Sequence, residues 1–274
     1  MPKPVNTSAR AQEPVKGPVD KAMEVLEVLV ADGGGPHRLG EIARRTGLAK
    51  PTVHRHLRAM AEQGFARPAE GGSYRPGPRL LGLAAAALDT SPDLALARPA
   101  LRDLRTRTGL RALYAVRDAD EYVLLELSEP AGEYGCAARP GDRAPLHRGG
   151  PGLAILSALP AAEADAVLAA AKPLRAAVHA RNGPGALRAE AAAAARRGYA
   201  LDDGYEEPDV RCLAAPVTEA DGRVVGALGV RGLAFVLGEE SVALYGPMVR
   251  AAARALSAGL GGRRLEAVAE AGES

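Results

Sequence analysis

The sequence predicts an α+β protein, and two observations lead to that class. Three amphipathic helical segments followed by a short hairpin lie between residues 19 and 77, which is the plan of a winged helix-turn-helix. Beyond them, Ala-rich helical segments are segregated from short apolar strands, which pair around turns such as Asp118-Ala119-Asp120. Helices segregated from antiparallel strands are typical of α+β domains.

The chain begins with a polar tail and one amphipathic helix. Residues 1–18 contain four prolines, so we expect them to be disordered. Residues 19–30 are predicted to be helical because apolar side chains recur there at helical spacing, and Gly33-Gly34-Gly35-Pro36 ends this helix. The stripe expected to be buried consists of Val19, Ala22, Met23, Leu26 and Val30.

A tight helix-turn-helix follows. Its first helix, residues 39–46, places the small residue Ala43 where two helices must cross closely. Gly47 lies in a turn that requires a positive φ. The second helix, residues 51–63, carries Pro51 at its first position, where a missing N–H costs no hydrogen bond. Its buried stripe comprises Val53, Leu57 and Met60.

A hairpin and a linker helix come next. Residues 65–67 and 73–75 are expected to pair around the turn Glu70-Gly71-Gly72, and residues 79–88 form a further helix. The predicted boundaries are an N-terminal domain at 19–77, a linker at 78–93, a second domain at 94–260 and a disordered tail at 261–274.

The second domain mixes helices and strands. Helices are predicted over residues 95–108, 151–158, 162–171, 185–197 and 241–260. Strands are predicted over residues 110–116, 122–127, 134–138, 211–217 and 224–230. In the last strand, alternation would put Val224, Gly226 and Leu228 on one face and Val225, Ala227, Gly229 and Arg231 on the other.

Charge is distributed unevenly along the chain. Residues 38–79 contain nine basic and three acidic side chains, a net charge of +6. From residue 80 onward there are 22 basic and 25 acidic side chains, a net charge of −3. A basic segment joined to a slightly acidic remainder indicates a module that binds a polyanion, and a solvated basic surface is the alternative.

Cysteine usage and hydropathy predict the compartment. The two cysteines, Cys136 and Cys212, lie 76 positions apart, and the N-terminus has no apolar stretch of the secretory type. No apolar run approaches the ~18 residues of a membrane span. We therefore expect a soluble cytoplasmic protein with reduced thiols and no membrane partner.

The basic segment and the winged helix-turn-helix together predict a DNA-binding surface. With the apolar stripe of the second helix turned inward, Arg55 faces outward and is the best candidate for reading guanine. Lys50 and Thr52 would touch phosphates or bases, and Arg75 in the hairpin would reach backbone or minor groove. A solvated side chain is the alternative for each. The predicted DNA-binding set is Arg44, Lys50, Thr52, His54, Arg55, Arg58 and Arg75.

Five stretches in this order resemble the IclR family of bacterial transcription regulators. They are VDKAMEVLEVL (19–29), LGEIARRTGLAKPTVHRHLRAM (39–60), YRPGPRLLGL (74–83), GDRAPLH (141–147) and GYALDDGYEEPDVRCLAAPV (198–217). The likeness covers roughly residues 19–260. It implies a winged helix-turn-helix, a linker helix and an effector domain that resembles GAF and profilin-like folds.

The resemblance also implies a function. Such proteins form homodimers, often homotetramers, bind operators in double-stranded DNA, and respond to small metabolites, often organic acids. Repressors and activators both occur, and no cofactor is expected. The positions that match the family's ligand pocket are Gly150, Pro151, Asp202, Cys212, Gly229 and Arg231.

The chain departs from the family pattern at several of these places. Pro51 stands where Ser or Thr is usual, and His56 stands where an apolar residue is usual; His56 is expected to be half-buried at the helix crossing rather than turned to solvent. After Pro-Leu-His, residues 148–154 lack the family's lysine and contain a proline. Gly229 and Arg231 replace frequent serines, so the location of the pocket carries over better than its specificity.

Arg231 predicts a carboxylate ligand. A buried guanidinium needs a counter-charge, which either Asp202 or the carboxylate of an acid would supply. Gly229 would leave room for an acid with an extended or aromatic body. Alternatively, Arg231 ends its strand in solvent beside Gly232.

Three other functions are compatible with parts of the sequence. An enzyme would use Cys212, His147 and Asp202, but no spacing brings them together, and a thiol in an apolar strand is usually buried. A metal site at Cys136, Cys212 and His147 lacks short ligand spacing. A DNA-binding dimer without a ligand remains open. A dimer is expected in either case, because Leu80, Leu81, Leu83 and Leu88 make the linker helix too apolar to stand alone.

Overall fold

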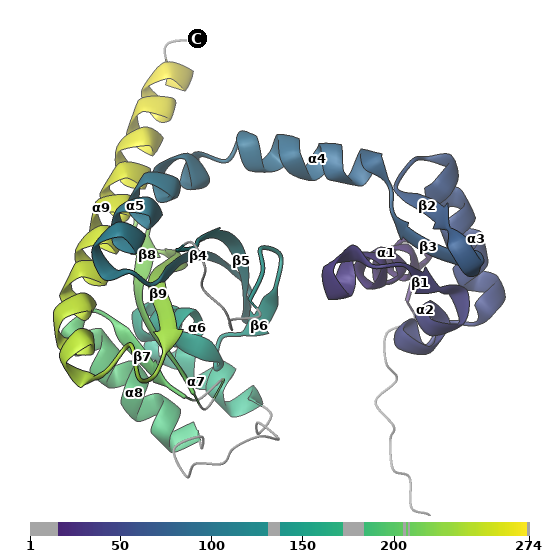
Figure 1. Ribbon diagram of the computed structural model, residues 1–274. Coiled ribbons are helices and arrows are strands. Elements are labelled where there is room, and N and C mark those ends of the chain that lie inside the picture. The colour runs from purple at the N-terminus through teal and green to yellow at the C-terminus, as the bar shows by residue number, and fades with distance from the viewer. Residues whose placement is uncertain (1–15, 131–137, 172–183, 205–206, 208, 273–274) are drawn as a thin grey trace, which may run out of the picture. The chain divides into compact units, whose positions relative to one another are not determined.

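A computed structural model describes residues 16–130, 138–171, 184–204, 207 and 209–272, and divides the chain into two compact units, Met1–Thr90 and Ser91–Ser274 (Figure 1). The first unit contains, in chain order, α1 (Pro18–Gly34), β1 (His37–Arg38), α2 (Leu39–Thr46), α3 (Lys50–Glu62), β2 (Ala66–Ala69), the 3₁₀ turn η1 (Glu70–Gly72), β3 (Ser73–Pro76) and α4 (Pro78–Asp89). Its three strands form an antiparallel sheet in the order β1-β3-β2. The predicted winged helix-turn-helix is confirmed, with β1 as an additional strand.

The turn between α2 and α3 follows from its residues. Gly47 adopts φ +70°, the left-handed conformation that glycine enters without a steric cost. Ala43 and Val53 are buried on either side of this turn, and their side chains belong to one cluster with Ile42. Small and apolar residues at these positions therefore fix the crossing of the two helices.

Helix α1 buries a different face from the predicted one. Val25 and Leu29 are completely buried in the cluster with Ile42 and Leu57. The outer positions of the predicted stripe, Val19, Met23 and Val30, are 69%, 48% and 47% exposed. The segment carries apolar residues on two overlapping helical faces, and its sequence alone does not say which face meets the other helices.

The start of α4 is fastened to the end of α3. The backbone N–H of Gly77 donates to the carbonyl of Phe65 at 2.8 Å, and a Cβ on Gly77 would lie 2.2 Å from the carbonyl oxygen of Gly64. The guanidinium of Arg79 stacks over the Phe65 ring at 5.0 Å and donates to the carbonyl of Gln63 at 3.1 Å. Helix α4 therefore starts in a defined place, although within its unit it buries none of its residues.

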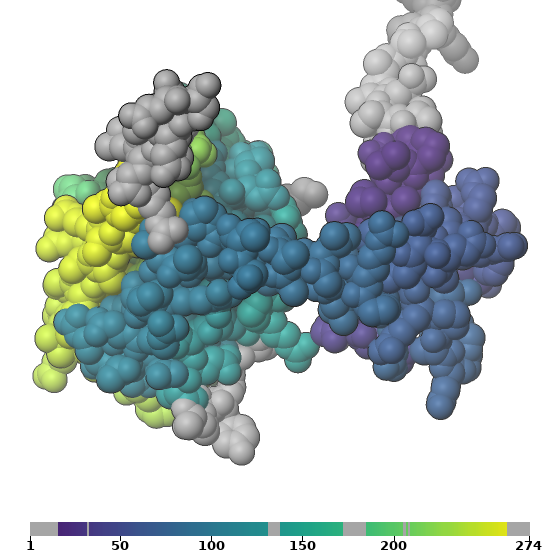
Figure 2. Space-filling model, turned by 90° about the horizontal axis from the view of Figure 1, so that it is seen from above, coloured from purple at the N-terminus to yellow at the C-terminus, as the bar shows by residue number. Residues whose placement is uncertain are grey.

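The second unit is built on one antiparallel sheet in the order β6-β5-β4-β9-β8-β7. Its elements are α5 (Pro92–Thr108), β4 (Arg111–Asp118), β5 (Glu121–Ser128), β6 (Arg143–Pro145), α6 (Gly149–Ala158), α7 (Ala161–Ala170), α8 (Pro184–Arg197), β7 (Ala200–Asp203), β8 (Val210–Thr218), β9 (Val224–Leu233) and α9 (Glu239–Gly272). Helices α5 and α9 cover one face, and α6, α7 and α8 lie on the other (Figure 1). Figure 2 shows α5 and α9 side by side.

Alternation along the central strands gives each face its own core. Tyr114, Leu213 and Leu228 point toward α5 and α9. Ala214 and Ala227 point toward α6 and pack in one cluster with Leu153 of that helix. Small residues on the α6 side let this helix approach the sheet closely, and this approach shapes the site described below.

Several predicted elements differ from the structure. Strand β9 alternates as expected from Ala227 onward, but a register shift opposite Val217 and Thr218 turns Val224 toward the α6 side, and Val225 packs against the other core. The chain from Gly261, predicted to be disordered, continues α9 to Gly272, because Arg, Leu, Glu and Ala favour helix there. Residues 134–137 of the strand predicted at 134–138 and most of the tail at 1–18 lie outside the described residues, and Ala138 is not part of a strand. Strand β7 was not predicted.

Within the described residues, no single helix is long and apolar enough to cross a bilayer.

Candidate functional site

Helix α3 presents one continuous polar face to solvent. Lys50, His54, Arg55 and Arg58 are exposed and Thr52 is half-exposed, whereas the stripe of Val53, Leu57 and Met60 is buried. The predicted outward side chains therefore share the side of the helix opposite the core. Arg44, at the end of α2, is exposed as well.

The cations of this face differ in how they are paired. Arg58 forms an ion pair with Glu62, one helical turn later, with 3.0 Å between Nε and Oε1. Within the described residues, Arg44, Lys50 and Arg55 have no ion pair or side-chain hydrogen bond. Unpaired, exposed cations on the outer face of a helix-turn-helix are suited to meeting phosphates and base edges.

The two arginines of the wing differ in exposure. Arg75 lies opposite Arg67 in the antiparallel pairing of β3 and β2, and its side chain is half-buried with Nε shielded from solvent. Arg67 is exposed. A shallow hollow of about 460 Å³ beside the strands of the wing is lined by both arginines, Pro36 and Ser73. Arg67, which was not among the predicted DNA-binding residues, therefore belongs to the same surface.

The half-burial expected for His56 is observed, whereas no contact at the helix crossing is assigned to it. Its residue is half-buried, and Nε2 is shielded from solvent without a hydrogen-bond partner within the described part of the chain. Pro51 is exposed in the first turn of α3, so the only contact it offers is apolar.

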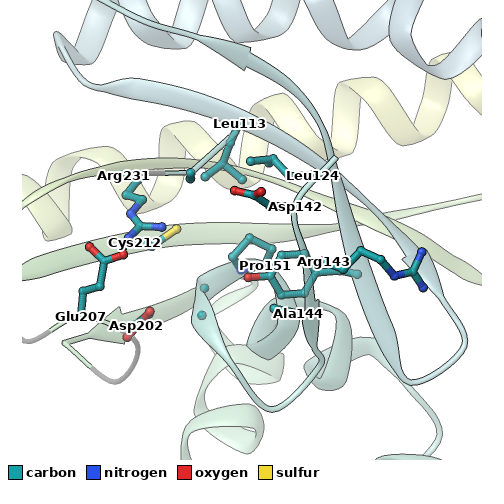
Figure 3. Close-up of a pocket in the computed structure, with 14 residues that line it drawn as sticks. Leu113, Leu124, Asp142, Arg143, Ala144, Pro151, Asp202, Glu207, Cys212 and Arg231 are labelled. Carbon is teal, nitrogen blue, oxygen red and sulfur yellow. Dashed lines mark ion pairs between the residues drawn. The ribbon is translucent and has the colours of Figure 1, made fainter. Parts of the chain in front are cut away.

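The second unit contains a cavity of about 270 Å³ between the N-terminus of α6 and the sheet (Figure 3). Five of the six residues predicted for a ligand pocket line it: Gly150, Pro151, Asp202, Cys212 and Arg231. Strands β4 and β5 supply the apolar wall, which comprises Leu113 and Leu124. Further lining residues are Tyr122, Ala138, Asp142, Arg143, Ala144, Gly149 and Glu207.

Glycines allow α6 to begin against the sheet. A Cβ on Gly150 would lie 2.6 Å from the Sγ of Cys212, and one on Gly152 would lie 2.3 Å from the carbonyl oxygen of Leu146. Pro151 sits in the first turn, where its missing N–H breaks no helical hydrogen bond. The helix therefore directs its positive N-terminal end toward the cavity.

Charged groups around the cavity are paired within the protein. Arg231 on β9, with a side chain 14% exposed, forms an ion pair with Glu207 at 2.5 Å. Arg143 pairs outside the cavity with Asp118 at 2.5 Å and Glu121 at 2.9 Å, and hydrogen bonding to Asp118 and then to Glu121 raises its pKa. Asp142 accepts a hydrogen bond from the backbone N–H of Arg139 at 2.7 Å through Oδ2.

Gly229 was predicted to leave room for a ligand, and the structure does not place it at the cavity. It is absent from the lining of the cavity, and a Cβ on it would lie 2.4 Å from the carbonyl oxygen of Leu213. Its missing side chain therefore permits close packing within the sheet and leaves no extra room for a ligand.

The carboxylate that pairs with Arg231 was also not identified from the sequence. The structure shows Glu207 as its partner, while Asp202 is buried elsewhere in the cavity wall. Both Glu207 and Asp142 lie in stretches that carried the family resemblance. The resemblance did not indicate that either residue lines the cavity or that Glu207 pairs with Arg231. Contacts between residues 24 positions apart cannot be derived from spacing.

The enzyme and metal-site hypotheses depended on cysteines. Cys212 is buried, and within the described residues no group of three or more His, Cys, Asp or Glu side chains is arranged to hold a metal ion. Cys136, the other sulfur of the metal hypothesis, lies outside the described residues.

Comparisons with known proteins agree with this geometry. A family model described as the C-terminal domain of the bacterial transcriptional regulator IclR matches residues 85–258, and the IclR helix-turn-helix domain matches residues 18–70. The chain is 30% identical over 268 residues to the acetate operon repressor of Salmonella typhimurium, covering 96% of each chain.

Solved structures extend the comparison. An IclR transcriptional regulator from Silicibacter sp. TM1040 is 30% identical, with a TM-score of 0.75 over 89% of this chain and 96% of that one. An IclR homologue from Microbacterium hydrocarbonoxydans, in complex with 4-hydroxybenzoate, is 26% identical, with a TM-score of 0.74 over 89% of this chain and 99% of that one.

Proposed function

The chain belongs to the IclR family of bacterial transcription regulators, which are DNA-binding proteins and not enzymes, and from this premise we propose that an organic acid in its C-terminal domain changes its affinity for an operator. The observation that carries the proposal is the division of labour between the two units. One unit exposes unpaired cations on α3, and the other contains a cavity next to a helix N-terminus. The cytoplasm, where the chromosome is, is the proposed site of action.

Operator contact is assigned to α3 and the wing. Arg55, exposed near the middle of the helix, reads a guanine through its two-pronged guanidinium. Lys50, Thr52 and Arg44 bind phosphates near the start of the helix, where they fix its register in the major groove. His54 and Arg58 flank them, and Arg67 joins Arg75 at the wing.

A homodimer is the proposed binding unit. One helix-turn-helix covers a short half-site, which supplies too little affinity and too little sequence information for a genome. Leu81 and Leu83 of α4 are 64% and 53% exposed, and α1 leaves a second apolar stripe uncovered. These surfaces are suited to pairing with another copy, and a homotetramer would require a further contact.

The acid is assigned to the cavity next to α6. A carboxylate would be stabilised by the positive end of α6 and by the Arg231 guanidinium, whose five N–H donors can serve Glu207 and a ligand together. The Microbacterium homologue in complex with 4-hydroxybenzoate supports an acid of about the size of one substituted ring. Residues assigned to the ligand are Gly150, Pro151, Asp202, Cys212 and Arg231.

The test uses the full chain and DNA from its own promoter region. Fluorescence anisotropy at low salt should show specific binding, and an effective acid should shift the dissociation constant. A protein that binds no promoter fragment would overturn the proposal. Binding that no acid changes would instead favour a DNA-binding protein whose second domain only dimerises.

A further inference from the structure

We propose, on the basis of the homodimer proposed above, that a joint between α3 and α4 determines which separation of operator half-sites the protein accepts. The joint consists of the turn at residues 63–65 and the start of α4 at residues 77–79. Gly77 and Arg79 would then determine specificity, although neither is among the residues assigned to operator contact.

The chain leaves α3 through a closed turn. The N–H of Gly64 donates to the carbonyl of Ala61 at 3.0 Å, and the N–H of Phe65 donates to that of Met60 at 2.8 Å. Gly64 adopts φ +77°, and a left-handed glycine with these two bonds makes a Schellman motif. The Phe65 side chain packs against the cluster to which Met60 belongs. Both the backbone and the side chain of Phe65 are therefore fixed relative to α3.

The same turn holds the first residues of α4. The N–H of Gly77 donates to the carbonyl of Phe65 at 2.8 Å, and the N–H of Arg79 donates to that of Gly64 at 3.1 Å. The N–H groups of a helix's first turn have no partner within the helix, and Gly77, the N-cap residue, provides no side-chain hydrogen bond. The chain that follows α3 therefore takes the place of a capping side chain for α4.

Arg79 closes the joint on its exposed side. Its guanidinium donates to the carbonyl of Gln63 at 3.1 Å and to Oε1 of the same residue at 2.9 Å, and it lies over the Phe65 ring at 5.0 Å. Gln63 is the C-cap of α3, where carbonyl groups have no partner within the helix. Each helix therefore satisfies polar groups at the end of the other.

Gly77 makes the close approach of the two helix ends possible. It is buried, and a Cβ at this position would lie 2.2 Å from the carbonyl oxygen of Gly64 and 2.8 Å from the carbonyl carbon of Phe65. Its φ of −88° is open to any L residue, so the requirement for glycine comes from this contact alone. A side chain here would push the start of α4 away from the end of α3.

A fixed joint constrains a dimer that pairs through α4. This helix buries none of its residues within its unit, and Leu81 and Leu83 are exposed, so it is the proposed contact with the second copy. With α3 fixed to α4, and α4 to its partner, the two recognition helices are held at one distance and one relative rotation. Each base pair added between the half-sites changes these quantities by about 3.4 Å and about 34°. The dimer should therefore reject half-sites that are two base pairs closer together or farther apart.

The experiment measures discrimination between half-site spacings by the full-length protein. The parent protein selects its operator from a random DNA library, and fluorescence anisotropy then compares this operator with versions that have two base pairs inserted or removed between the half-sites. The parent protein should bind the altered spacings at least about tenfold more weakly, since even one lost base contact has an effect of this size.

Two variants test the joint. Arg79→Gln removes the stacking and the charged donors, and it should reduce the discrimination by about threefold to tenfold. Gly77→Ala should reduce it further or shift the preferred spacing, because the backbone of Gly64 cannot avoid the new Cβ. Discrimination is a ratio of affinities for two spacings, so a uniform loss from the removed charge cancels. The base preference within one half-site should not change.

Gly35→Ala is the matched control. Gly35 lies in the same unit, and nothing is within 4 Å of the added Cβ, so this variant should keep the spacing preference of the parent protein. Thermal unfolding shows whether each variant is folded. Arg79→Gln alone decides the question if Gly77→Ala does not fold.

The outcomes separate this inference from the function on which it rests. Reduced or shifted spacing preference in either folded variant, with base preference intact, supports the joint. Unchanged discrimination in the folded variants, or a parent protein that accepts all spacings equally, overturns it; the spacing would then be governed elsewhere, for example through the uncovered stripe of α1. A change of base preference within a half-site also overturns it, since the variant has then altered the reading surface. A parent protein that selects no DNA overturns the proposed function itself.

Discussion

The outer face of α3 and the cavity beside α6 handle charge in opposite ways. On α3, Arg55 and Lys50 are exposed and unpaired within the described residues. Around the cavity, Arg231 and Arg143 each have carboxylate partners within the protein. The first surface keeps its cations available for a partner with many regularly spaced phosphates, whereas the second must recognise one small molecule without carrying an unpaired buried charge.

The largest expected effect is the dependence of operator affinity on salt concentration, and it tests this contrast directly. If a dimer makes about 8 phosphate contacts, log affinity for the operator should fall against log salt with a slope near −7, a loss of roughly 10³ to 10⁵ between about 50 and 200 mM. Affinity for the effector should change by less than about tenfold over the same range, because its partners are few and shielded. Anisotropy and calorimetry on the same preparation measure both, and similar slopes would break the comparison.

A smaller effect distinguishes two arginines on α3. Arg55→Ala should cost about 1–3 kcal/mol on the specific site and flatten the preference at one or two base pairs. Arg58→Ala is the matched control, since Arg58 is already paired with Glu62, and it should cost less and alter no base preference. Binding curves on single-base operator variants measure this. Equal losses on every sequence for Arg55→Ala would make it a phosphate contact.

A glycine substitution tests the cavity side. Gly150→Ala places a Cβ 2.6 Å from the Cys212 sulfur, so we expect about 1–3 kcal/mol of destabilisation and loss of effector binding, with operator binding retained in the absence of effector. Gly185→Ala, at a position with nothing within 4 Å of the added Cβ, serves as control. Chemical denaturation and calorimetry give the two quantities, and unchanged ligand affinity would show that α6 adapts.

The same contrast explains which features could be predicted from the sequence. The helix-turn-helix depends on local signals, such as Gly47 at a positive φ and the stripe that starts at Val53, and these were predicted correctly. The prediction of which face of α1 is buried was wrong, because both of its apolar stripes satisfy helical periodicity. The pairing of Arg231 with Glu207 and the true role of Gly229 depend on contacts across strands that only the folded sheet creates.

The smallest effect concerns Tyr114, which neighbours the cavity wall residue Leu113 but points into the other core. Its side chain is fully buried with its hydroxyl 3.5 Å from Asp93, and burial, followed by the charge of Asp93, raises its pKa above the ordinary value of 10.0. Above pH 10 the unfolded chain loses this proton while the folded chain keeps it. The free energy of unfolding of the second unit should therefore decline as the pH rises above about 10.

Tyr114→Phe should flatten this alkaline decline and cost about 1 kcal/mol or less at neutral pH, since the hydroxyl makes one long hydrogen bond. The measurement is denaturant unfolding at several pH values, and Tyr245→Phe, which leaves the Tyr114 hydroxyl in place, should retain the decline of the parent protein. A decline that persists unchanged in Tyr114→Phe would show that other groups govern alkaline unfolding. The buried hydroxyl would then be a packing feature without a measurable electrostatic cost, unlike the guanidinium of Arg231 at the cavity, whose burial is offset by its ion pair with Glu207.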